Sequence, residues 1–167
     1  MKKYSLLFLF ILCSFKNFAA GFSLASPAFE ANGMIPIAFT CNGADKSPPL
    51  FWHNVPANTR SLALVVEDPD APSGSWIHWI IFNIPPTLNA LDSTNLPEGA
   101  LLALNSWGNA KYQGPCPPLG AHRYVFTLYA LDKMLSLNNG VATRTALDMM
   151  TGHVIGSAVL AGLYQKE

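Results

Sequence analysis

The chain has 167 residues, half of them hydrophobic and only 12% charged, and its ten basic and ten acidic side chains give no formal net charge. Such a composition can form a sizeable core, and it excludes an intrinsically disordered chain, which has few apolar residues and a high charge. The length is typical of a single domain.

The first 20 residues have the pattern of a secretory signal peptide. Lys2 and Lys3 form a positive start, residues 6–13 are an apolar run too short to span a bilayer, and small residues at 19–21 offer a cleavage site. An uncleaved membrane anchor is the alternative. We therefore predict a signal peptide at 1–20 and a periplasmic or secreted domain at 21–167.

Removal of the signal peptide would leave a mildly acidic domain. Three basic residues would be lost with it, so seven basic side chains would face ten acidic ones, a net charge of −3 before histidines are counted. A domain of this charge without a basic cluster binds nucleic acid poorly and lacks the polybasic patch of a peripheral membrane protein. We expect no nucleic-acid partner.

The predicted elements are mostly short strands. Thirteen prolines and twelve glycines are scattered along the chain, which favours an antiparallel β architecture with frequent turns. One short helix is expected, with Thr143 as its cap and Gly152 as its stop. Strands are predicted from apolar runs at 22–24, 49–52, 61–67, 76–84, 123–131 and 154–164.

Between these strands, the loop at 108–120 is rich in proline and glycine. Because proline presets φ, the loop is expected to be stiff and irregular, as the wall of a preformed pocket must be. Cys116 lies in this loop, and Cys41 is the other cysteine of the predicted domain. An even pair in an exported protein favours a disulfide, and two buried free thiols are the alternative.

Polar candidates for a site occur in three segments. Asp68 and Asp70 follow a buried strand, His78 lies within the next strand, and His122 lies where the proline-rich loop enters a third. Each has a structural explanation on its own: aspartates hold turns, a lone histidine in an apolar run is often a hydrogen-bonded core residue, and a histidine can cap a strand end.

Together, these residues suit the binding of a small anion. Protonated imidazoles make charge-assisted hydrogen bonds to oxyanions, amides of a glycine-containing loop can line the opposite wall, and an aspartate can orient an imidazole. The sequence thus predicts a pocket built around Asp70, His78 and His122 that takes a monoanionic or zwitterionic head group.

The spacing of these segments carries a family resemblance. DPDAP at 68–72, Trp-x-His at 76–78 and GP-x-PP-x-G-x-HRY-x-F-x-x-Y at 114–129 resemble the two signature regions of the phosphatidylethanolamine-binding protein family. The bacterial and archaeal branch, which is similar to Raf kinase inhibitor proteins, is the best match. It also matches FTCNG at 39–43, SPPL at 47–50, Trp52, NIP at 83–85 and GHV at 152–154.

The resemblance implies a mainly β fold in which a central antiparallel sheet packs on a smaller one, with one or two short helices. It implies a pocket for phosphate or phosphoethanolamine-like groups and no cofactor. By matching motif positions, the ligand-binding residues would be Asp68, Asp70, Pro72, Trp76, His78, Gly114, Pro115, His122 and Tyr124.

Three functions remain as hypotheses. The first is a non-enzymatic protein that binds a small anion or phospholipid head group and inhibits or regulates a partner protein. The second is a hydrolase that uses Cys116 and His122 as nucleophile and base. The third is a metal-binding protein with Asp70, His78 and His122 as ligands. Whether the protein forms a homodimer stays open.

Overall fold

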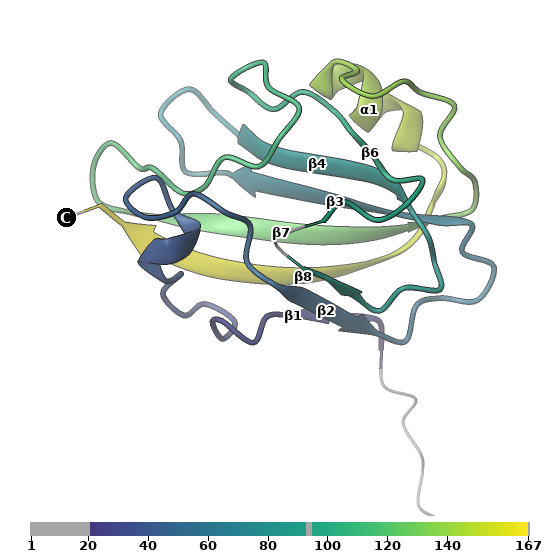
Figure 1. Cartoon of the computed structure of the whole chain (residues 1–167), viewed down its shortest axis with the longest axis horizontal. Helices are drawn as coiled ribbons and strands as arrows, with labels where there is room; N and C mark the ends of the chain where they lie inside the picture. Colours follow the sequence, from purple (N-terminus) through teal and green to yellow (C-terminus); the bar gives the residue numbers. More distant parts are fainter. Residues whose placement is uncertain (1–20, 93–94, 167) are drawn as a thin grey trace, which may run out of the picture.

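The computed structural model describes residues 21–92 and 95–166, so the predicted signal peptide lies outside the described residues (Figure 1). Two antiparallel sheets form the framework of this part of the chain. The large sheet has the strand order β6-β4-β3-β7-β8, and the small sheet has the order β1-β2-β5. This arrangement confirms the predicted mainly β fold, with a central sheet and a smaller one.

The strands occur close to the predicted positions. Both two-residue strands, β5 and β6, were not predicted, because two residues are too short to show a periodic pattern. In the large sheet the strands are β3 (Ser61–Asp68), β4 (Trp76–Ile84), β6 (Leu101–Leu102), β7 (Ala121–Leu131) and β8 (Val154–Gln165). In the small sheet they are β1 (Ser23–Ala25), β2 (Leu50–His53) and β5 (Ala90–Leu91).

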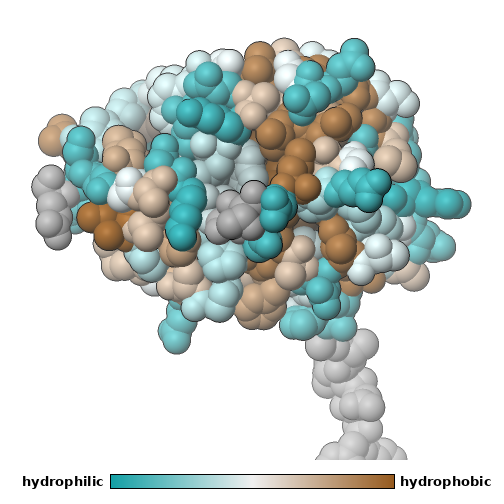
Figure 2. All heavy atoms as spheres, viewed as in Figure 1, coloured by the Kyte–Doolittle hydropathy of each residue, from teal (hydrophilic) through white to brown (hydrophobic). Residues whose placement is uncertain are grey.

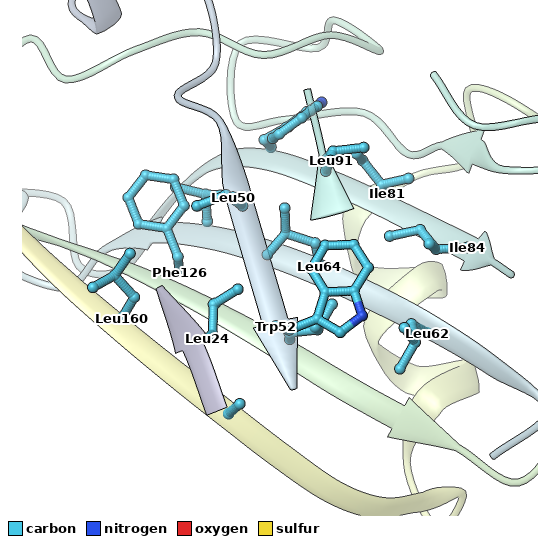
Figure 3. Close-up of a cluster of buried hydrophobic side chains, with 14 of the residues drawn as sticks. Leu24, Leu50, Trp52, Leu62, Leu64, Ile81, Ile84, Leu91, Phe126 and Leu160 are labelled. Carbon is cyan, nitrogen blue, oxygen red and sulfur yellow. The ribbon is translucent and has the colours of Figure 1, made fainter. Parts of the chain in front are cut away.

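The large sheet is covered on both faces, which explains why β3 and β4 read as nearly continuous apolar runs. On one face, Leu62 and Leu64 of β3 pack against Trp52 and Leu24 of the small sheet (Figure 3). On the other face, Ala63 belongs to a second cluster of buried side chains. With both faces buried, alternation between polar and apolar residues disappears from the sequence.

The second cluster is covered in part by helix α1 (Thr143–Met150), near the β4–β6 side of the large sheet (Figure 1). Ala146 and Met150 are buried there. Thr143 does not cap the helix as predicted. Its hydroxyl donates to the carbonyl of Leu104, and the N-cap position is held by Ala142 without a side-chain bond. No helix among the described residues is long and apolar enough to cross a membrane.

Two irregularities in β4 change which face its side chains occupy. Glu67 pairs with Ile77 and Val66 pairs with Trp79, so His78 is the extra residue of a β-bulge. A second register shift lies opposite the segment between Leu62 and Leu64 of β3.

The effect of the bulges is visible in the two clusters. Trp79 and Ile81 face the small sheet, whereas Ile80 and Phe82 lie in the helix-side cluster. Regular alternation would place residue 77 with Trp79, but Ile77 lies in the helix-side cluster instead. Before the bulge, therefore, the side chains of β4 point to the opposite faces from those expected by counting back from Trp79. Trp76 and His78 consequently point toward the small-sheet face.

The second irregularity contains Asn83, a buried residue with φ 58°. Its Nδ2 donates to the carbonyl of Leu135 at 2.9 Å, and its Oδ1 accepts from the Leu135 N–H at 2.8 Å. Asparagine tolerates left-handed backbone better than most residues. One side chain thus holds the bulge and the chain that follows β7.

We expect Asn83→Ala to lower the free energy of unfolding by about 2–4 kcal/mol, because two buried backbone groups of Leu135 would lose their partners. Urea denaturation measures this loss. Asn58→Ala is the matched control, since Asn58 also has left-handed backbone, with φ 69°, but is exposed. Equal losses in the two variants would show that backbone conformation alone sets the cost.

Candidate functional site

A cavity of about 310 Å³ lies where three strands of the large sheet meet. Because β3 is antiparallel to both neighbours, its end lies beside the starts of β4 and β7. The volume is at the lower end of the range for small-molecule sites. The cavity is lined by Asp68, Ala71, Pro72, Ser73, Trp76, His78, Trp107, Cys116, Pro118 and Tyr124.

The cavity is lined by five of the nine residues that the family resemblance assigned to ligand binding. These five are Asp68, Pro72, Trp76, His78 and Tyr124. The other four, Asp70, Gly114, Pro115 and His122, do not line it.

His122 does not line the cavity but is bonded to the lining residue Asp68, which orients its ring. Its Nδ1–H donates to Oδ2 of Asp68 at 2.7 Å, and both side chains are buried. The other carboxylate oxygen, Oδ1, accepts the backbone N–H of Asp70 at 2.9 Å. Asp68 therefore links the cavity to His122 and holds the turn after β3.

Asp70 corrects the predicted arrangement, in which it would face the cavity with the two imidazoles. Its carboxylate instead pairs with Arg123, accepting Nε–H at 2.9 Å, Nη2–H at 2.6 Å and the backbone N–H at 2.9 Å. These hydrogen bonds hold the pKa of Asp70 well below its usual range. Asp68, two residues earlier, lines the cavity in place of Asp70. Asp70 is turned instead toward the backbone and guanidinium of Arg123 on β7.

His78 reaches the cavity because of the bulge in β4. Its Nδ1 lies 2.6 Å from the carbonyl oxygen of Gln113, which can only accept, so Nδ1 carries the hydrogen. The rings of Trp107 and Tyr124 stand edge-on to the imidazole at 5.0 and 5.2 Å. Burial lowers the pKa of His78, and the Gln113 hydrogen bond offsets this only in part. The neutral imidazole is thus favoured near pH 7, with Nε2 as its second nitrogen.

One buried amide holds the loop that supports His78. Asn105 donates through Nδ2 to the Lys111 carbonyl at 3.1 Å and to Gln113 Oε1 at 2.9 Å. Its Oδ1 accepts from the backbone N–H groups of Trp107 and Asn109, both at 3.0 Å. Asn105 therefore fixes both the wall residue Trp107 and the partner of His78. Neither Asn105 nor Trp107 was predicted as a site residue, although an aromatic residue in a polar, glycine-containing loop was a usable signal.

Gly114 and Pro115 attach the proline-rich loop to the body of the protein. The Gly114 N–H donates to Oδ1 of Asp45 at 2.6 Å, and a Cβ at this position would clash with the Phe39 carbonyl. The Pro115 carbonyl accepts from the N–H of Cys41 at 3.1 Å. These two residues position the cavity wall, and their side-chain positions do not form it.

The predicted disulfide is confirmed: Cys41 and Cys116 are joined, with their Cα atoms 5.5 Å apart. Cys116 also lines the cavity, so the bond ties the cavity wall to the segment before β2. A sulfur in a disulfide is not available as a nucleophile. The structure therefore contradicts the hydrolase hypothesis based on Cys116 and His122.

The metal hypothesis meets a different difficulty. Asp70, one of its three proposed ligands, is committed to Arg123. Residues 21–92 and 95–166 contain no group of three or more His, Cys, Asp or Glu side chains placed to hold a metal ion.

Two buried donors on residues that line the cavity have no hydrogen-bond partner among the described residues. They are Nε1 of Trp76 and the hydroxyl of Tyr124. Asp68 and the backbone of Cys116 lie close enough to Tyr124 to affect its pKa, but no well-formed bond joins them, and burial keeps the phenol protonated by raising its pKa. Because an unpaired buried donor costs about 1–3 kcal/mol, such a pair on two lining residues makes this cavity the candidate site for a group with acceptor atoms.

A second cavity, of about 360 Å³, lies between the sheets near β5 and β6. Its walls include the buried aromatic pair Trp79 and Tyr112 and the exposed side chains of Lys46 and Lys111. Hydrophobic side chains also gather on this face of the molecule (Figure 2). Neither of the two unpaired buried donors of the described chain lies there, so the smaller cavity is the better candidate site.

Comparisons with known proteins identify the family of the chain. A sequence model of the family described as phosphatidylethanolamine-binding protein matches residues 25–165. The chain belongs to this family. A UPF0098 protein of Methanothermobacter thermautotrophicus is 48% identical to it over 149 residues, which cover 86% of this chain and 99% of the relative.

Solved structures of the phosphatidylethanolamine-binding protein family have the same fold. A putative phosphatidylethanolamine-binding protein homologue from Chlamydia trachomatis has a TM-score of 0.84 and 41% identity, and the match covers 89% of this chain and 100% of that one. Escherichia coli YbcL, described as a member of the mammalian family, has a TM-score of 0.82 and 31% identity with the same coverage. Family membership supports a ligand-binding protein and makes no direct statement about catalysis.

Reduction of the disulfide is expected to destabilise the protein. The bond closes a loop across 75 residues, and its removal should lower the free energy of unfolding by about 2–4 kcal/mol through added entropy of the unfolded chain. Denaturant unfolding with and without a thiol reductant measures the change. The Cys41→Ser/Cys116→Ser variant, which should not respond to the reductant, is the control. An unchanged midpoint with both thiols shown to be free would contradict the expectation.

Acid is expected to weaken the fold through His78. Because burial lowers its pKa below the ordinary 6.5, the unfolded chain takes up a proton that the folded protein resists, so stability falls as pH drops below about 6.5. Urea unfolding at about pH 7.5 and pH 5 should show a smaller drop in His78→Gln than in the native sequence. His53→Gln, which changes an exposed histidine, should keep the full drop. Equal drops in all three proteins would exclude this role of His78.

Proposed function

We propose that the protein is a non-enzymatic binding protein that takes a small oxyanion or a phospholipid head group into the 310 Å³ cavity. The observation that carries the proposal is the pair of buried donors, Trp76 Nε1 and Tyr124 OH, without a partner in the described chain. Oxygen atoms of a phosphoryl or carboxyl group are acceptors for both. Bound ligand would satisfy the two donors and offset the cost of burying them.

The remaining polar groups of the cavity favour a ligand that also carries a donor. Asp68 is a carboxylate and accepts hydrogen bonds. Nε2 of His78 accepts a hydrogen bond in the neutral ring and donates one when it is protonated. A ligand that offers acceptors on one side and a hydroxyl or ammonium on the other matches this arrangement. Phosphoethanolamine-like and other monoanionic or zwitterionic groups have this chemistry.

Export and regulation of a partner protein are parts of the same proposal. Residues 1–20 have the signal peptide pattern, and a disulfide persists in the oxidising compartments outside the cytosol. In this proposal the protein acts through the ligand that it holds and through the partner that it contacts. The partner would be a protein of the same compartment, and no nucleic acid is expected.

Titration of isotope-labelled protein with phosphoethanolamine and with inorganic phosphate, followed by NMR, tests the proposal. Signals of the Trp76 indole N–H, the His78 ring and the Tyr124 backbone should move together. Trp76→Phe and Tyr124→Phe each remove one donor and should weaken binding roughly fivefold to tenfold.

Tyr129→Phe is the matched control, because Tyr129 lies on the same strand but outside the cavity. Its affinity should equal that of the native protein. Saturation without any shift at these three residues, or shifts confined to the second cavity near Trp79, would overturn the proposal.

A further inference from the structure

The cavity has an unusual charge for an anion site. Its lining contains one carboxylate, Asp68, and none of the lysine or arginine side chains of the described chain. Arg123 is near in sequence to His122, but its guanidinium is held outside by Asp70. An anion that enters therefore meets a carboxylate that no lysine or arginine offsets and whose partner, His122, is a cation only when protonated, which is unfavourable in a partly buried site.

His78 is the cavity residue that can supply the missing positive charge. Its Nδ1–H is already used by the carbonyl of Gln113, at 2.6 Å, and this bond fixes the ring. Nε2 is the remaining nitrogen and carries the lone pair in the neutral form. A proton added at Nε2 creates a cation in the cavity without breaking any existing hydrogen bond.

The groups around His78 act in opposite directions on its protonation, and burial outweighs the others. Asp68 from β3, which also lines the cavity, and Asp45, which is bonded to the Gly114 N–H, are carboxylates that favour the protonated ring, as does the backbone of Gly114. Tyr124 from β7 and Trp107 from the loop enclose the ring in apolar surface, and this burial favours the neutral form. An anion beside Nε2 would add a third negative charge and shift the balance toward protonation.

We infer that the cavity binds an oxyanion together with one proton, which His78 holds at Nε2. The inference rests on the proposed function and defines its ligands as oxyacids. The proton comes from solvent when the ligand enters as an anion, and from the ligand's own acid hydroxyl when it enters protonated. In both cases the product is an imidazolium paired with an anion, so binding and proton uptake are linked.

Dimethyl phosphate tests the inference, because it stays a monoanion across the pH range of the protein and any pH dependence of its binding belongs to the protein. Calorimetry near pH 7.5, in buffers of different ionisation enthalpy, should show uptake approaching one proton for each ligand bound. The affinity should fall by up to about tenfold for each unit of rising pH above the pKa of the unliganded ring. The NMR signals of the His78 ring should titrate at higher pH in the saturated protein.

Two variants assign the proton to its residue. His78→Gln should abolish proton uptake and leave weaker, pH-independent binding, whereas His53→Gln, which alters an exposed histidine, should keep the full uptake. If His78→Gln does not fold, the NMR titration of the native protein still decides. Binding without proton uptake, or uptake that persists in His78→Gln, would overturn the inference and leave the proposed function standing. Failure of dimethyl phosphate, inorganic phosphate and phosphoethanolamine to bind at any pH would overturn both.

Discussion

The site depends on the bulge at His78 in β4. Without that extra residue, the alternation set by Ile80 and Phe82 would direct residue 78 into the helix-side core. The bulge instead turns the imidazole toward Tyr124 on the small-sheet face. Its backbone is not left unsatisfied, since the carbonyl of His78 accepts from the Gln113 N–H at 3.3 Å and that of Ile77 from the Ser106 N–H at 2.9 Å. The loop that compensates for the bulge thus also builds the cavity wall.

That wall is rigid because independent bonds hold it at several points. Asn105 uses its amide to tie Trp107 and Gln113 together, and the Gly114 N–H is anchored by Asp45. The disulfide at Cys116 fixes the end of the same loop. Few of these contacts involve the ligand cavity directly, yet each sets the position of a group that lines it. Such preorganisation reduces the ordering that a ligand would otherwise have to impose.

The two aspartates of the DPDAP segment have different roles although they are two residues apart. Asp68 is buried and joins His122 to the cavity, whereas Asp70 forms an exposed bidentate pair with Arg123. Because Asp70 pairs with Arg123, the cavity lining holds one carboxylate, Asp68, and the imidazole of His78, whose neutral form is favoured. These two groups set the charge of a ligand that fits the cavity. Asp68 and Asp70 belong to one motif but have different roles, because they bond to His122 and Arg123. These two residues are neighbours on β7, so their side chains point to opposite faces of the strand.

The sequence by itself determined the strands, the mainly β class and the family, because apolar runs, turn residues and long spaced motifs are local features. It also pointed to the cavity segments and to the pairing of Cys41 with Cys116. Only the tertiary structure decided which aspartate reaches the cavity, that Trp107 and Asn105 belong to the site, and that His78 crosses to the small-sheet face. The physical reason is that β4 is apolar on both faces, so neither its bulges nor the facing of its side chains leaves a periodic signal. Those features come from pairing with β3 and from loops distant in the chain.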